Sequence, residues 1–411
     1  MKNERKTITI IGGGPAGLIA AQHLSTLPDI DVHLYDQKPS VGRKFLIAGR
    51  GGLNLTHSED TVSFLKRYGP AENFLKPFVE VFSPADIQSW ARDLGIETFV
   101  GSSGRIFPTE MKATALMRAW TRRLTDQGVQ VHLQHTFIGF NDTNSPVFLN
   151  KDGNEIVVKA DALLFATGGA SYPHLGATGA WAQELEKQDI NVVPFKAMNC
   201  GFNVEWSEHL SVKFAGQPLK NIELCINGEK CHGDLIVTEY GLEGGTIYGV
   251  SRTLNETLDQ NETATLLLDL RPEFNAEQLA IKLEAPRKKQ SLSTFLRKQL
   301  KLSPLEIALI WEHCNKETVQ DPQRLAEAIK KLPITIVSAR PINRAISSMG
   351  GINTSELNTQ LMIKNHPGWF AAGEMIDWDA PTGGYLLQAC FSTGVAAANG
   401  IKHWLKSDKQ I

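Results

Sequence analysis

The chain has 411 residues, of which 42% are hydrophobic and 21% charged, the composition of an ordinary soluble globular enzyme. Its 42 basic and 44 acidic residues give a formal charge of −2, so nothing in the composition indicates a nucleic-acid partner. The length exceeds one ordinary domain, and we expect two or three structural units.

The chain carries no sign of a targeting or membrane segment. The apolar run 8–11 is too short for the core of a signal peptide. The longest apolar stretch, 385–404, is interrupted by polar residues and predicts a buried helix. Five scattered cysteines, without the close spacing of a flavin disulfide reductase, are typical of a reduced protein. We therefore expect a cytoplasmic protein without a membrane partner.

The first 40 residues predict a strand (7–11), a helix (15–27) and a second strand (31–35). The turn between them reads Gly12-Gly13-Gly14-Pro15-Ala16-Gly17 and fits the G-x-G-x-x-G dinucleotide fingerprint. In this motif Gly12 permits the tight turn, Gly14 leaves room for a pyrophosphate, and Gly17 lets the helix pack closely on the strand. Free N–H groups and the positive dipole at the helix start attract the phosphates. The motif fits both NAD and FAD.

An acidic residue follows the second strand where dinucleotide-binding units need one. Asp36 lies 19 residues beyond Gly17, and a carboxylate there accepts hydrogen bonds from the adenosine ribose. We assign the adjacent Gln37 to the same cofactor site. A surface acid without a ligand is the alternative.

A basic and glycine-rich segment comes next. Arg43 and Lys44 can offset phosphate charge, and Asn54 and Thr56 offer polar contacts. The glycines between them allow backbone to lie against a flat ring. Read alone, this segment is more typical of a plain loop.

The middle of the first region is mainly helical over 72–132, apart from a glycine-rich excursion at 100–108. A strand (129–133), a hairpin (147–150 with 155–158) and an apolar strand (162–166) follow. The last strand ends in Thr167-Gly168-Gly169, a turn that flavin enzymes use to close over the cofactor. Tyr172 and His174 come after it and are weak candidates for proton transfer. Packing and loop polarity are the favoured alternative for both.

Short strand-like runs over 196–270 predict an antiparallel sheet or small barrel, and 275–331 predict charged helices.

Tyr240, Glu243 and Tyr248 are candidates for the lining of a substrate cavity, and Arg105 for an anion contact. We interpret a local basic patch as a solvated helix face; it comprises Arg287, Lys288, Lys289, Arg297 and Lys298.

Strand-like runs return at 334–337, 360–363 and 369–371, and the C-terminal segment then favours FAD over NAD. A strand, a glycine turn and an acid would lie against the pyrophosphate and ribityl chain. A helix start aimed at the flavin pyrimidine would stabilise the charge that develops there on reduction. The residues assigned to these contacts are Gly373, Glu374, Asp377, Gly383, Gly384, Tyr385, Leu386 and Gln388.

These motifs together resemble the BaiN-like, or aminoacetone-oxidase-like, family of FAD-dependent oxidoreductases. The matching pieces are GGGPAG at 12–17, GRK at 42–44, GGLNLTH at 51–57, GRIFP at 104–108, ATGGASYPHLGATG at 166–179, MGG at 349–351 and GEMIDWDAPTGGYLLQ at 373–388. Residues 48–54 depart from the family's usual S-G-G-G-R-C-N, and residues 240–245 from its S-G-P-A form, which indicates a subfamily. The resemblance implies non-covalent FAD, with either oxygen or NAD(P)H as electron partner.

The expected fold is α/β: a Rossmann-like (GR2-type) FAD domain with an inserted barrel-like β-rich domain and a helical piece. We expect the FAD domain at 1–195 and 333–411, the β-rich domain at 196–272 and the helical segment at 273–332. The expected function is hydride transfer between a small organic substrate and the flavin. An FAD-dependent nucleic-acid (tRNA) modifying protein and a redox-sensing flavin module are the alternatives. No second G-x-G-x-x-G follows a strand, so NAD(P)H would visit only transiently, and the isolated histidines indicate no metal.

Overall fold

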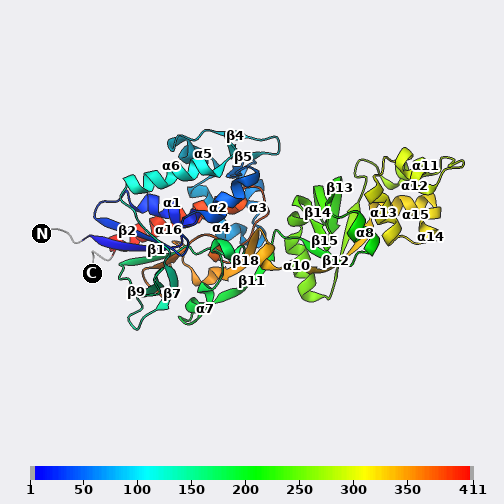
Figure 1. The fold of residues 1–411 in the computed structure, drawn as a ribbon. Helices are drawn as coiled ribbons and strands as arrows, with labels where there is room; N and C mark the ends of the chain where they lie inside the picture. Colours follow the sequence, from blue (N-terminus) through cyan, green and yellow to red (C-terminus); the bar gives the residue numbers. More distant parts are fainter. Residues whose placement is uncertain (1–4, 408–411) are drawn as a thin grey trace. The chain divides into compact units, whose positions relative to one another are not determined.

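The computed structural model describes residues 5–407, and the chain divides into two compact units. Unit 1 joins the residues up to Lys196 with those from Ser347 onward, and unit 2 is the segment between them. Figure 1 shows both units.

Unit 1 is organised around a parallel sheet that combines strands from the N-terminal and the C-terminal segment of the unit. The strand order is β19-β10-β1-β2-β6. In the centre, Ile8 pairs with Val32 on one side and with Ala162 on the other. The central strand β1 is buried on both faces, since Ile8, Thr9 and Ile10 are all fully buried. The bounds are β1 (Lys6–Ile11), β2 (Ile30–Asp36), β6 (Gln130–Leu133), β10 (Ala162–Phe165) and β19 (Trp369–Ala371).

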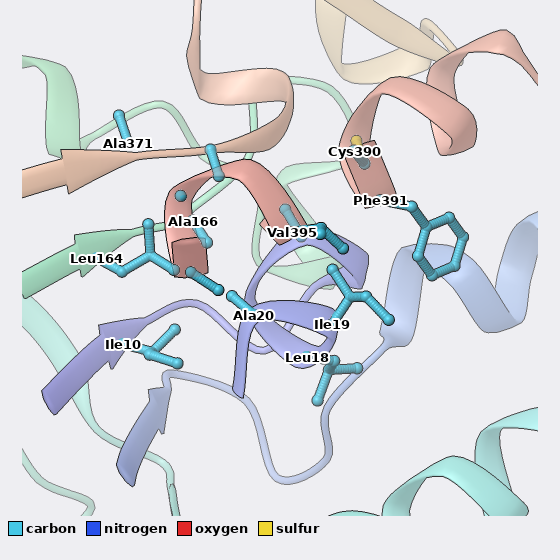
Figure 2. Close-up of a cluster of buried hydrophobic side chains, with 14 of the residues drawn as sticks. Ile10, Leu18, Ile19, Ala20, Leu164, Ala166, Ala371, Cys390, Phe391 and Val395 are labelled. Carbon is cyan, nitrogen blue, oxygen red and sulfur yellow. The ribbon is translucent and has the colours of Figure 1, made fainter. Parts of the chain in front are cut away.

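Two helices from opposite ends of the sequence pack on this sheet. Helix α1 (Pro15–Leu24) lies against α16 (Tyr385–Ser407). Figure 2 shows the apolar layer that they share with β1 and β10, including Ile10, Leu164 and Phe391. All three side chains are fully buried. This packing brings the first and last segments of unit 1 together.

The remaining elements of unit 1 lie between and beyond these strands. The glycine-rich excursion at 100–108 is a β-hairpin, which extends into a small antiparallel sheet of order β3-β5-β4. The predicted hairpin at 147–158 gains a third strand, β7, that the sequence did not reveal. The bounds are α2 (Arg43–Ala48), β3 (Thr56–His57), α3 (Thr61–Lys66), α4 (Glu72–Val81), α5 (Pro84–Asp93), β4 (Thr98–Val100), β5 (Arg105–Pro108), α6 (Ala113–Asp126), β7 (Thr136–Phe140), β8 (Pro146–Leu149), β9 (Glu155–Val157), α7 (Trp181–Glu186), β11 (Val192–Met198) and β18 (Ser347–Ile352).

Unit 2 is a closed antiparallel barrel with a helical segment inserted between its strands β16 and β17. The strand order is β12-β15-β14-β13-β16-β17, and β12 closes the ring by pairing with both β15 and β17. A separate apolar core fills it. The bounds are β12 (Phe202–Val204), α8 (Glu208–Lys213), β13 (Gln217–Ile226), β14 (Glu229–Val237), β15 (Gly241–Glu243), α9 (Gly245–Gly249), α10 (Ser251–Gln260), β16 (Ala264–Asp269), α11 (Ala276–Leu283), α12 (Leu292–Gln299), α13 (Pro304–His313), α14 (Lys316–Gln320), α15 (Pro322–Lys330) and β17 (Leu332–Ala339).

The chain returns to unit 1 later than residue 333, where the sequence analysis placed the boundary. Strand β17 alternates buried Leu332, Ile334 and Ile336 with exposed neighbours, so its apolar face fills the barrel. The barrel and the helical segment form one unit rather than two. The expected strand at 360–363 forms only isolated bridges, Met362 with Phe370 and Leu357 with Ile363.

Candidate cofactor-binding site

The turn between β1 and α1 is built from glycines that approach other backbone closely. Gly12 has φ of +113°, and a Cβ there would lie 2.2 Å from the carbonyl oxygen of Ala166. A Cβ on Gly17 would lie 2.0 Å from the carbonyl oxygen of Gly12. The geometry therefore agrees with a tight turn at Gly12 and close helix–strand packing at Gly17.

Gly14 is different because it borders open space. A Cβ on Gly14 would meet no heavy atom within 4 Å. It is the N-cap of α1, no side chain caps the helix there, and Pro15 occupies the first turn. Uncapped N–H groups beside open backbone are an arrangement that binds anions such as phosphate.

Asp36 ends β2 and holds the glycine turn in place. Its Oδ2 accepts a hydrogen bond from the Gly13 N–H at 2.8 Å, and its Oδ1 accepts one from the Lys38 N–H at 2.7 Å. Burial raises the pKa of this carboxyl, although both hydrogen bonds act in the opposite direction. Each carboxylate oxygen can accept a further hydrogen bond. The neighbouring Gln37 donates from Nε2 to the carbonyl of Gly176 at 2.7 Å.

The C-terminal segment meets the N-terminal turn at Gly373, the first residue of the 3₁₀ helix η6 (Gly373–Met375). Gly373 has φ of +83°, and a Cβ there would lie 2.9 Å from the Cβ of Ala16. Its N–H donates to Thr393 Oγ1 at 3.0 Å. Residues 12–17 therefore lie beside η6 and α16, as expected for a nucleotide held between the two chain ends.

A third turn lies at the same edge of the sheet, because β10 runs parallel to β1. Gly168 has φ of +75°, and a Cβ on it would meet no heavy atom within 4 Å. Its neighbour Gly169 is enclosed, since a Cβ there would lie 2.1 Å from Ser348 Oγ. Thr167 Oγ1 lies 3.6 Å from Met375 Sδ. Gly168 is thus a second stretch of open backbone, after Gly14.

Two buried polar atoms in the segment after β2 support the same location. Among the residues that the structure describes, Asn54 Oδ1 and Arg43 Nε are buried without a hydrogen-bond partner. Such atoms are uncommon in folded proteins and require an explanation. Together with the open backbone at Gly14 and Gly168, they fit a dinucleotide such as FAD.

Lys44 and Glu374 contact each other, which the sequence did not reveal. Lys44 Nζ donates to Glu374 Oε2 at 2.7 Å and to Ser171 Oγ at 2.9 Å. The two side chains are 25% and 13% exposed, so the ion pair is partly shielded from water. The charge of Lys44, which we expected to offset phosphate, is already balanced by Glu374. The pair ties the segment after β2 to η6 at the candidate site.

Thr56 and Gln388, both expected to contact a cofactor, are fully enclosed by protein. Thr56 Oγ1 donates to Gln388 Oε1 at 2.6 Å, and Gln388 Nε2 donates to the carbonyl of Phe82 at 2.6 Å. A Cβ on Gly384 would lie 2.6 Å from the Cα of Thr56. These side chains fix the start of α16 against β3 and leave only backbone for a ligand.

The first residue of α16 belongs to a polar cluster in unit 1. Tyr385 OH donates to Glu59 Oε1 at 2.5 Å, and Arg67 Nη2 donates to Glu59 Oε2 at 2.9 Å. The ring of His57 stacks on Tyr385 with centroids 5.5 Å apart. Burial, followed by the hydrogen bond to Glu59, raises the pKa of Tyr385. The phenol is therefore engaged inside the protein, and Leu386 beside it is half-buried. Gly383, with φ of +137°, precedes the cluster.

Of the remaining candidates in unit 1, Asp377 is the best supported by its surroundings. Its Oδ1 accepts from the Gly350 N–H at 3.1 Å, and burial raises its pKa. Tyr172 has φ of +58°, its ring lies 5.7 Å from that of His174, and His174 is exposed. Arg105 is exposed on β5. Among the described residues, no acid or base other than these two forms a hydrogen bond or ion pair with the side chain of Tyr172 or His174.

Unit 2 brings together the three residues suggested as a cavity lining. Tyr240 OH donates to Glu243 Oε1 at 2.6 Å, and Tyr248 OH donates to Glu243 Oε2. The guanidinium of Arg340 lies 4.0 Å from the Tyr240 ring centroid. Burial, then the hydrogen bond to Glu243, raises the pKa of Tyr240 to about 12. Arg340 was not predicted to contact Tyr240, because the two residues lie far apart in the sequence and no local pattern links them.

Within the described residues, no group of three or more His, Cys, Asp or Glu side chains could hold a metal ion. In the same part of the chain, no helix has both the length and the apolar character needed to cross a membrane.

A family model described as "HI0933-like protein Rossmann domain" matches residues 6–400. The chain is 26% identical to a ribosomal RNA dihydrouridine synthase of Haemophilus influenzae, over 95% of this chain and 97% of that protein. It is 24% identical to a 3-dehydro-bile acid delta(4,6)-reductase of Clostridium scindens, with the same coverage of each chain. In fold it resembles a flavocytochrome c3 fumarate reductase (16% identity, TM-score 0.52, 98% of this chain and 79% of that one). A 3-ketosteroid delta1-dehydrogenase of Sterolibacterium denitrificans is similar to the same degree (12% identity, TM-score 0.52, 98% and 100%).

Proposed function

Because this chain belongs to the HI0933-like family of FAD-binding Rossmann proteins, we propose that it is an FAD-dependent reductase of small organic substrates. The observation that carries the proposal is the open backbone at Gly14 and Gly168, which lies between the two converging chain ends. Bound FAD would supply hydride chemistry, and the protein would supply binding, orientation and electrostatics.

Different residues around the open backbone would bind different parts of the dinucleotide. Gly12, Gly14 and the start of α1 would hold the pyrophosphate, and Asp36 the adenosine ribose. Asp377, positioned by Gly350, would accept a ribityl hydroxyl. Asn54 would gain the hydrogen bond that it lacks among the described residues. Backbone at 383–385 would face the flavin pyrimidine, held there by the contact of Gly384 with Thr56.

The direction of the reaction is suggested by the two relatives, whose names describe formation of a dihydro product and reduction at positions 4 and 6. Both fit reduction of a carbon–carbon double bond conjugated to a carbonyl. One carbon gains a hydride and its neighbour a proton, and the two electrons come from NAD(P)H acting as a transient donor. Tyr172 and His174 remain candidates for the proton donor.

Purified protein should be yellow with the absorption bands of bound flavin. Anaerobic NADPH or NADH should bleach these bands, and an α,β-unsaturated ketone should restore them without oxygen. A colourless protein that also fails to bind added FAD would overturn the proposal. Reoxidation by oxygen alone would favour an oxidase over a reductase.

A second candidate is reduction of uridine in RNA. It is favoured by the relatives named as ribosomal RNA dihydrouridine synthases and by the exposed basic residues of the helical segment. The measurement is the dihydrouridine content of ribosomal RNA from cells with and without the gene. An unchanged content in the deletion strain would eliminate this candidate and leave the first one standing.

A further inference from the structure

The helical segment of unit 2 concentrates positive charge that the rest of the chain lacks. Residues 282–301 contain seven Lys and Arg and one Glu, a net charge of 7 − 1 = +6. Since the whole chain has −2, all other residues sum to −2 − 6 = −8. The sequence analysis interpreted these residues as a solvated helix face, but a solvated face does not require positive charges to cluster in one segment.

The structure shows that six of these basic side chains are exposed. We call them the basic surface: Arg287, Lys288, Lys289, Arg297, Lys298 and Lys301. Arg287 to Lys289 lie between α11 and α12, and Arg297 and Lys298 lie in the last turn of α12. An eight-residue helix is about 12 Å long, so the two groups are separated by roughly that distance.

Some exposed cations elsewhere in the chain have a carboxylate partner, whereas the clustered cations of the basic surface have none among the residues that the structure describes. Elsewhere Lys187 pairs with Glu184, and Lys230 with Glu223, each at 2.8 Å. Within residues 5–407, no member of the basic surface lies within ion-pair distance of an acid. Unbalanced, clustered cations are the electrostatic footprint of a polyanion-binding surface.

The burial of the apolar side chains on the same helices indicates which kind of polyanion fits the basic surface. Leu279, Leu283, Phe295 and Leu296 are buried in the core of unit 2. Of the large apolar side chains on α11 and α12, Ile281 alone is exposed, which is too little apolar area for stable insertion into a lipid surface. Phe295, the aromatic residue of α12, is 3% exposed and cannot stack on an unpaired base. Polar Gln290 and Gln299 are exposed among the cations. The surface therefore suits phosphates in a duplex better than either alternative.

We propose that the basic surface docks double-stranded RNA through its phosphates, without reading sequence. The proposal rests on the second candidate function, because the basic surface would supply the contact that holds an RNA substrate. Binding of this kind releases counterions, so its affinity falls steeply with salt.

The test uses the full-length protein and a fluorescein-labelled 20-base-pair RNA duplex, with anisotropy measured from 50 to 300 mM KCl. In the variant K288Q/K289Q/R297Q/K298Q, duplex affinity should fall at least tenfold at 100 mM KCl. The slope of log K against log salt should become shallower by about 0.9 for each lost phosphate contact. The variant K220Q/K316Q removes exposed lysines of the same unit outside the surface and should behave as wild type.

Unchanged affinity and slope in the fourfold variant would overturn the proposal. So would tighter binding to single-stranded RNA of equal length, or to phosphatidylserine vesicles, than to the duplex. The variants K288Q/K289Q and R297Q/K298Q, made separately, give a graded result if the fourfold variant is unstable. Retained yellow colour and bleaching by NADPH in these variants would show that the FAD function stands independently.

Discussion

At the scale of single residues, the glycines of the first turn do two different physical jobs. Gly12 has a positive φ and backbone where a Cβ would be, so it is required by the fold itself. Gly14 has φ of −82° and ψ of 179°, which any residue adopts, and open space where a Cβ would be. Only a bound group would make a side chain at Gly14 unfavourable.

This contrast predicts different outcomes for two alanine substitutions. Gly14→Ala should leave the thermal stability of the FAD-free protein unchanged or slightly higher, because alanine restricts the unfolded chain. It should weaken FAD binding at least tenfold, measured by quenching of flavin fluorescence. Gly12→Ala should destabilise the FAD-free protein by about 1–3 kcal/mol because it forces strained backbone. Equal FAD affinity in Gly14→Ala and wild type would argue against a pyrophosphate at this turn.

Asp36 gives a second prediction, with a pH dependence. Asp36→Ala should weaken FAD binding about tenfold to a hundredfold, since a hydrogen bond to a charged group contributes about 1.5–3 kcal/mol. In the proposed site the ionised carboxylate would accept the ribose hydroxyls, and burial raises its pKa. FAD affinity should therefore be highest above this raised pKa and fall as the pH drops through it. Titration of FAD at several pH values should show the fall in wild type and not in Asp36→Asn.

For other candidate site residues, the structure shows a protein partner that the sequence did not reveal. The basic and acidic residues of the pair Lys44–Glu374 were each assigned to the cofactor, yet they lie 330 positions apart and contact each other. Likewise, Thr56 and Gln388 share a buried hydrogen bond across the site. Local motifs identify residues near a ligand, but the partner of a polar side chain depends on chain segments that only the fold brings together.

At the scale of elements, hydrophobic periodicity predicted most strands and helices but not where each one belongs. Strand β17 (332–339) alternates as a half-buried strand should, and its central part, 334–337, was correctly predicted as a strand. Its assignment to unit 1 was wrong because alternation reports burial of one face and not the identity of the sheet. Strand β7 was not predicted, because its pairing register with β8 shifts near Gly139 and the alternation of its side chains is interrupted there.

The barrel and the helical segment of unit 2 are joined by a buried ionic network around Arg271. Its Nη1 donates to Glu306 Oε1 at 2.6 Å, and its Nε donates to the carbonyl of Leu300 at 2.9 Å. Arg271 and Glu306 are 9% and 5% exposed. A charge so enclosed is tolerated only while its partner is present.

Arg271→Met should therefore destabilise unit 2 by about 3–5 kcal/mol, because it leaves the Glu306 carboxylate buried without its counter-charge. Chemical denaturation followed by circular dichroism measures the change. The matched control is Arg324→Met, which removes an exposed pair with Glu317 at 3.9 Å and should cost about 0–1 kcal/mol. Similar small effects for both variants would mean that the network does not hold the helical segment in place.

At the scale of the whole molecule, the sequence predicted an α/β cofactor domain with a β-rich insertion, and both are present. The two units have separate apolar cores, so each has its own source of folding free energy. The candidate FAD site is assembled from Gly14, Asp36, Gly168 and Gly373, all in unit 1. A ligand that binds one unit stabilises that unit by mass action.

FAD should therefore act selectively in a thermal unfolding experiment. At a free FAD concentration 100 times its Kd, unit 1 gains about 2.7 kcal/mol, which raises its transition by several degrees. The transition of unit 2 should stay in place with and without FAD, and Arg271→Met should lower it alone. In Gly14→Ala, the same FAD concentration should shift neither transition appreciably. If FAD raised both transition temperatures of the wild-type protein by equal amounts, the two units would unfold as one cooperative unit. The expectation that FAD stabilises unit 1 selectively would then be wrong.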